Sequence, residues 1–204
     1  NTYTVSKFQT GCGIVDIMMH TMERYLTGDG ECDLTERLAE ALLVSVREAG
    51  RTAIAHPEDY EARATLMWAS SLSHNDLTGC GKQRKFPAHK LEHPVSALHD
   101  TVAHGAGLSV LFPAWAQYVM QHDIMKFAQL ANRVWDCHMN FDHPERTAQA
   151  GIDAMKRYFT EIGMPTRMSE LGLTPDEYEA IIHLTTKGGV QPVKSYIDLY
   201  PDDI

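Results

Sequence analysis

Apolar residues recur every three or four positions along most of the chain, the spacing of one face of an α-helix. In the first such stretch, 13–26, Ile14, Met18 and Met22 share a face, and the glycines of 28–30 then close it as a turn. The same period predicts further helices at 33–56, 58–73, 89–99, 108–120, 123–137, 144–162 and 175–186. We therefore expect one all-α domain, a bundle of roughly seven to nine helices.

Residues typical of helix ends mark two of these starts. Asp33 with Glu36, and Thr174 with Glu177, match the capping box, in which each side chain bonds the other residue's backbone N–H. No stretch alternates convincingly between apolar and polar residues, although a short β segment at 2–5 fits the sequence. The pattern thus leaves little room for a sheet.

Composition narrows the class of partner. The chain has 204 residues, a net charge of −9 and no block of basic residues, so we expect neither nucleic acid nor membrane as a partner. No apolar run approaches the ~20 residues that span a bilayer, and the polar start does not fit a signal peptide. The four cysteines form no C-x-x-C pair, which indicates reduced thiols and a cytoplasmic protein.

The two ends of the chain look cut. It begins at Asn1 rather than at methionine and stops just after Tyr200 and Pro201, a turn-like pair. We therefore expect residues 1–204 to be one domain of a longer protein.

The strongest chemical signal is a run of histidines. His89, His93, His99 and His104 fall within sixteen residues, followed by a Gly-Ala-Gly segment. That segment lacks the G-x-G-x-x-G pattern that binds dinucleotides. Neutral imidazoles are good ligands for Fe(II), Zn(II) and similar cations. The density of histidines therefore indicates a metal site.

A second piece lies upstream. Asp16 and His20 are four residues apart in a predicted helix, so their side chains lie on one face. This pair alone is common by chance, but with His89, His93 and His104 it supplies enough ligands for one cation. The other histidines are scattered, and we expect them at the surface or at helix caps: His56, His74, His122, His138, His143 and His183.

Five segments together carry a family resemblance. They are 13–25 (GIVDIMMHTMERY), 63–69 (RATLMWA), 74–75 (HN), 88–97 (AHKLEHPVSA) and 104–115 (HGAGLSVLFPAW). In order and spacing the chain resembles the C-terminal helical domain of the iron-containing alcohol dehydrogenases, which is dehydroquinate synthase-like, and most of all the butanol-dehydrogenase-like group. The resemblance covers nearly the whole chain.

The resemblance implies a function and a set of site residues. Asp16, His20, His89 and His104 would bind Fe(2+), or Zn(2+), and His93 would act beside the substrate as a proton relay. His89 and His104 stand one position further apart than is usual in the family, with the extra residue within 100–103.

The resemblance also implies cofactors and partners. NAD or NADP would bind to an N-terminal α/β domain that this chain lacks, and we expect its C-terminal end to lack the last helical turns as well. The substrate would be a small alcohol or aldehyde. The intact enzyme would form a homodimer or higher homo-oligomer, and the fragment alone would be inactive.

Two other functions fit parts of the sequence. A helical metal-dependent phosphohydrolase of the His-Asp type would use His99 and Asp100 as its central dyad. A helical interaction module with incidental histidines would bind no stoichiometric metal. The aromatic residues Trp68, Phe112 and Trp115 either line an apolar pocket or belong to the core.

Overall fold

The computed structural model describes residues 2–26 and 32–204, and it confirms the all-α prediction. Short 3₁₀ turns join some of the helices, and Val193 and Leu199 form an isolated β-bridge. The described residues contain these α-helices: α1 Lys7–Tyr25, α2 Asp33–Ala55, α3 Tyr60–His74, α4 Pro87–Leu98, α5 His104–Val119, α6 Ile124–Trp135, α7 Pro144–Glu161 and α8 Pro175–Thr186.

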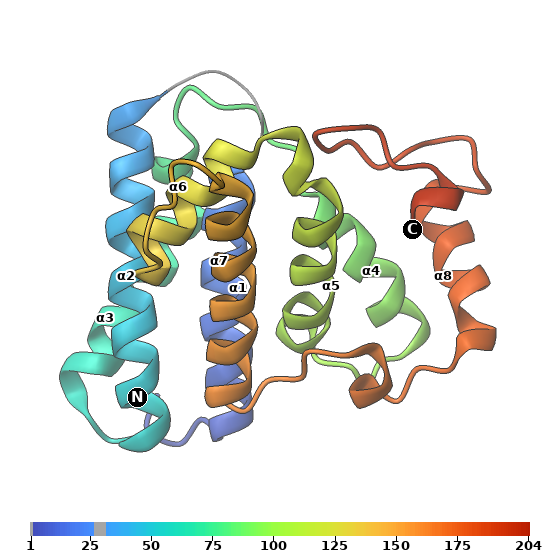
Figure 1. The fold of residues 1–204 in the computed structure, drawn as a ribbon. Coiled ribbons are helices and arrows are strands. Elements are labelled where there is room, and N and C mark those ends of the chain that lie inside the picture. The colour runs from blue at the N-terminus through green and yellow to red at the C-terminus, as the bar shows by residue number, and fades with distance from the viewer. Residues whose placement is uncertain (1, 27–31) are drawn as a thin grey trace.

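Helix α1 packs against four of the other helices that the structure describes. It contacts α2 and α3 on one side and α5 and α4 on the other, while α6 and α7 pack together beside them. Figure 1 shows α2 and α3 at one end of the molecule and α8 at the other. The apolar residues of α1 point into this core from several directions, and Val15, Met18, Met19 and Met22 have no exposed surface. Packing on several sides therefore fixes the positions of these buried side chains.

Two predicted features at the start of the chain were wrong. Helix α1 begins at Lys7, well before 13, because the Ser6 hydroxyl accepts a hydrogen bond from the Gln9 N–H and caps it. The expected β segment at 2–5 is a turn, closed by the Val5 N–H on the Thr2 carbonyl at 3.1 Å. The expected turn at 28–30 lies outside the described residues.

The two capping boxes had opposite outcomes. Thr174 and Glu177 form theirs, with the Thr174 N–H donating to Glu177 at 2.7 Å. The box expected at Asp33 and Glu36 does not form, because Glu36 is buried and pairs with Lys82 and Lys126 instead. Two lysine ammonium groups outcompete one backbone N–H for a carboxylate.

Helix α5 begins at His104 rather than at 108, so two glycines lie inside its first turn. A Cβ atom on Gly105 would lie 2.3 Å from the backbone oxygen of Cys12, and one on Gly107 would lie 2.6 Å from the Glu92 carboxylate. These glycines allow α5 to approach α1 and α4 closely. That approach carries His104 toward α1.

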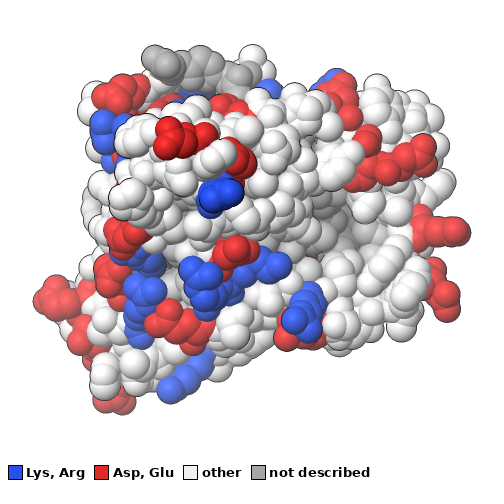
Figure 2. Space-filling view, in the orientation of Figure 1, with Lys and Arg blue, Asp and Glu red and all other residues white. Residues whose placement is uncertain are grey.

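The surface carries charges of both signs, although the chain as a whole is acidic, with a net charge of −9. On the face shown in Figure 2, Lys and Arg are interspersed with Asp and Glu. Within the described ranges, none of the helices is long and apolar enough to cross a membrane.

Candidate metal centre

Three imidazoles surround one oxygen of Asp16. Oδ1 of this carboxylate lies 3.7 Å from Nε2 of His20, 3.7 Å from Nε2 of His89 and 3.6 Å from Nε2 of His104. Helix α1 supplies Asp16 and His20, α4 supplies His89, and α5 supplies His104. The fold therefore brings together the four residues singled out as metal ligands.

Two buried glutamates hold two of these rings from behind. Glu23 on α1 contacts Nδ1 of His89, and Glu92 on α4 contacts Nδ1 of His104. Both glutamates are almost completely inaccessible to solvent. A carboxylate behind an imidazole fixes the Nδ1–H tautomer and turns the Nε2 lone pair outward, an arrangement common around metal ligands.

Each glutamate also serves a second donor. The other oxygen of Glu23 accepts the Ala88 N–H at the start of α4, at 2.6 Å. The other oxygen of Glu92 accepts the hydroxyl of Ser96. The two carboxylates thus fix both the helix positions and the rings.

This arrangement fits a divalent cation. Nε2 of His89 is buried and has no hydrogen-bond partner. With its proton on Nδ1, the ring would turn a lone pair toward the Asp16 carboxylate, which is unfavourable unless a proton or a cation lies between them. Ligand bonds of about 2.1 Å give a tetrahedron with edges of about 3.4 Å, and the three edges that meet at Oδ1 correspond to separations of 3.6–3.7 Å. The possible ligand atoms of Asp16, His89 and His104 all lie within 4.8 Å of one another, as do those of Asp16, His20 and His74.

The pKa values of the residues in the cluster are shifted in different directions. Burial, and then the charge of His89, lower the pKa of His20 to about 4. Burial also opposes protonation of His89, but the carboxylates of Asp16 and Glu23 outweigh it and raise its pKa to about 9. Burial alone would raise the pKa of Asp16, yet the surrounding imidazoles lower it. At neutral pH, His89 therefore carries a proton that a cation would replace.

The segment in which the resemblance predicts one extra residue, 100–103, lies between α4 and α5. Residues 99–103 form the connection from α4 to α5, which includes a turn from the Val102 N–H to the His99 carbonyl at 3.0 Å. His104 still reaches Asp16.

His93 lies at the rim of the cluster. It is exposed on α4, its ring stacks on that of His104 with 5.6 Å between centroids, and the ring of His89 lies 6.3 Å away. Burial and the neighbouring His104 lower the pKa of His93, so the ring is neutral at pH 7. It is therefore close to the cluster and free to exchange a proton with solvent.

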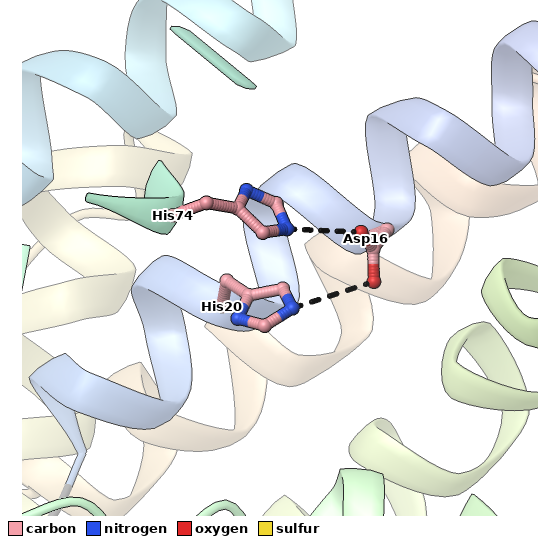
Figure 3. A group of neighbouring side chains, drawn as sticks. All are labelled: Asp16, His20 and His74. Carbon is pink, nitrogen blue, oxygen red and sulfur yellow. Dashed lines mark ion pairs between the residues drawn. The ribbon is translucent and has the colours of Figure 1, made fainter. Parts of the chain in front are cut away.

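The prediction of a surface or capping role for His74 missed its main contact. His74 ends α3, and its Nε2 lies 3.3 Å from Oδ2 of Asp16 (Figure 3). Its ring also packs against that of His20, with 4.0 Å between centroids. Only the packing of α3 on α1 creates this contact, so no local spacing rule signals it.

Phe86 is a second neighbour of the cluster that the sequence did not predict. It precedes α4 with a φ of 51°, a strained conformation for a residue with a side chain. Its ring meets His20 and His89 edge-on, at centroid distances of 5.5 and 5.4 Å. The strained residue thus covers one side of the histidine cluster.

His99 and Asp100, the dyad of the phosphohydrolase alternative, make no contact in the described part of the chain that supports a metal site. His99 pairs with Glu177 of α8 at 2.7 Å, and Asp100 is exposed beside it. Neither residue belongs to the possible metal-binding groups found among the described residues. The aromatic candidates also separate: Phe112 and Trp115 are buried in the core, whereas Trp68 is exposed.

Comparison with known proteins places this arrangement in a family. The sequence description of the Fe-containing alcohol dehydrogenase family, C-terminal region, matches residues 10–197. The NADH-dependent butanol dehydrogenase A of Clostridium acetobutylicum is 36% identical over 204 residues, which are 100% of this chain and 52% of that protein. The NADPH-dependent aldehyde reductase YqhD of Escherichia coli is 30% identical, over 98% of this chain and 51% of its own length.

Solved structures agree with the sequence comparison. The substrate- and cofactor-free form of the E. coli aldehyde reductase superposes with a TM-score of 0.91 at 30% identity, over 99% of this chain and 52% of that one. The NADH-dependent butanol dehydrogenase A of Thermotoga maritima gives 0.90 at 28% identity, over 98% of this chain and 51% of that one. The chain thus spans about half the length of these relatives.

Proposed function

Because this chain belongs to the iron-containing alcohol dehydrogenase family, we propose that it is the metal- and substrate-binding half of an NAD(P)-dependent alcohol dehydrogenase. Asp16, His20, His89 and His104 are its metal ligands. The observation that carries the proposal is the convergence of three Nε2 atoms on one Asp16 oxygen. Each ligand is a type that Fe(II) and Zn(II) accept.

The residues of this chain have two roles: they orient the metal ligands, and they transfer a proton. The cofactors supply Lewis acidity at the substrate oxygen and hydride exchange with a nicotinamide. Glu23 and Glu92 keep the His89 and His104 lone pairs turned toward Asp16. His93, neutral at the rim, passes the alcohol proton to solvent or returns it to an aldehyde oxygen.

The remaining parts of the proposal concern the whole enzyme. The enzyme uses a nicotinamide cofactor, NAD or NADP, a proposal supported by its NADH- and NADPH-dependent relatives. We propose that this cofactor binds to an N-terminal α/β domain. The substrate is a small alcohol or aldehyde, and the metal is Fe(2+) or Zn(2+). The intact enzyme is a cytoplasmic homodimer or larger homo-oligomer.

A comparison of two proteins tests this proposal. The full-length enzyme loaded anaerobically with Fe(2+) should oxidise NADH or NADPH in the presence of butanal, and His93→Ala should lower kcat while it retains the metal. Residues 1–204 alone should bind metal without turnover. Efficient aldehyde reduction by residues 1–204 alone, or a fully active Asp16→Asn enzyme, would refute the proposal.

A further inference from the structure

Asp16 presents its two oxygens to different partners. Oδ1 faces the Nε2 atoms of His20, His89 and His104, whereas Oδ2 faces Nε2 of His74 at 3.3 Å. In Figure 3 the rings of His20 and His74 reach this carboxylate from two different helices. A cation among the three Nε2 atoms would therefore leave the second oxygen to His74.

The other side of the His74 ring is also held. Its Nδ1 lies 2.8 Å from the Ser73 hydroxyl and 2.9 Å from the Ser70 carbonyl oxygen. Ser73 is completely buried, so this end of the ring is anchored in the protein. The ring is fixed between the backbone of α3 and the carboxylate on α1.

The proton positions around Nδ1 decide whether His74 donates to Asp16. The Ser73 hydroxyl has one proton, which it can give to the Ser70 carbonyl at 2.9 Å or to Nδ1. If Nδ1 accepts it, the neutral ring carries its hydrogen on Nε2, which faces Oδ2. A doubly protonated ring also presents an Nε2–H. Only the neutral tautomer with Nδ1–H turned to Ser70 sets a lone pair against Oδ2, and that form would need a second cation between His74 and Asp16.

We propose that His74 is a positioning residue that holds Oδ2 of Asp16, so that the carboxylate offers only Oδ1 to the metal. This inference rests on the proposed metal site. A carboxylate free to rotate must be ordered when the metal binds, whereas His74 orders it beforehand. Partners of this kind change metal affinity about tenfold to hundredfold.

The test compares His74→Ala with His74→Gln in residues 1–204. A glutamine places an N–H donor close to the position of the histidine Nε2, so it should rescue what alanine loses. His143→Ala is the matched control, since it removes another partly exposed histidine–carboxylate pair, to Glu145, outside the cluster. Zn(2+) affinity and stoichiometry are measured by competition with a chromophoric chelator, and urea unfolding of the metal-free proteins checks the fold.

The inference predicts one Zn(2+) per wild-type chain and about tenfold to hundredfold weaker binding in His74→Ala. His74→Gln and His143→Ala should stay within about threefold of wild type. Equal affinity of His74→Ala and wild type would overturn the inference alone, as would failure of glutamine to rescue. Two Zn(2+) per chain, the second lost in His74→Ala, would replace it with a second cation site. No Zn(2+) in the wild type would refute the proposed function as well.

Discussion

Replacing each buried glutamate by glutamine should affect metal binding unequally. Both oxygens of Glu23 accept from groups that can only donate while His89 presents Nε2 to a metal: its Nδ1–H and the Ala88 N–H. A glutamine has only one acceptor oxygen, so one of these donors must lose its partner. If His89 loses it, the ring favours the tautomer with its proton on Nε2, which cannot bind a metal.

Glu92 tolerates the same change better. Its partners are Nδ1 of His104 and the hydroxyl of Ser96. A hydroxyl can accept as well as donate, so the glutamine amide can donate to Ser96 while its oxygen still accepts from His104. Only the charge of the carboxylate is lost.

The expected losses of Zn(2+) affinity follow from the strength of the hydrogen bonds. A hydrogen bond to a charged group contributes about 1.5–3 kcal/mol, which corresponds to about tenfold to hundredfold in affinity. We expect Glu23→Gln to weaken Zn(2+) binding by about hundredfold and Glu92→Gln by about tenfold or less. Chelator competition near pH 9 suits this comparison, because proton competition at His89 is then small.

Two controls make the comparison decisive. Glu145→Gln changes a glutamate outside the cluster and should leave affinity unchanged. Urea unfolding of the metal-free variants separates a damaged fold from a damaged site. Equal losses in Glu23→Gln and Glu92→Gln, or no loss in either, would refute the reasoning from acceptor counts.

Four further predictions concern the pH dependence of stability, the pH dependence of metal binding, the packing of α5 and the role of His93. The pKa of folded His89 is about 9, above its ordinary 6.5, so its contribution to stability is complete below pH 6.5 and disappears as pH rises through 9. The pKa of folded His20 is about 4, so His20 costs stability as pH falls from 6.5 toward 4. Urea unfolding of the metal-free chain should therefore show maximal stability near pH 6.5. Between about pH 7 and 9 the apparent Zn(2+) affinity should rise about tenfold per pH unit, since one proton leaves His89; a flat profile would contradict that. Gly105→Ala should lower the unfolding free energy by about 3 kcal/mol, measured by denaturant titration, because its Cβ would overlap the Cys12 backbone; unchanged stability would show that α5 can shift freely. His93→Ala should retain wild-type Zn(2+) affinity in the same chelator assay, and a loss above about tenfold would make His93 a ligand instead.

Local rules predicted the features that depend on neighbours in the chain. The helical period located the helices, and the box at Thr174 formed because its partners lie within one turn. The i, i+4 spacing placed Asp16 and His20 on one helix face, as the structure shows. Each of these depends on contacts between residues a few positions apart.

Tertiary contacts decided the features that the sequence did not reveal. Glu36 left its predicted cap for two lysines distant in sequence. Gly105 marks a close helix crossing rather than the boundary before a helix at 108, which only the packing of α5 on α1 shows. His74 at the end of α3 contacts Asp16 on α1. None of these contacts follows from spacing along the chain.

The most direct test of the metal-centre proposal is the metal content of anaerobically purified residues 1–204, beside Asp16→Asn, His104→Ala and His99→Gln. The proposal predicts about one Fe or Zn per chain in the wild type and in His99→Gln, and almost none in the first two variants. A wild type without metal, or one whose metal survives both substitutions at the cluster, would contradict it. Metal lost only in His99→Gln would point to the dyad of His99 and Asp100 instead.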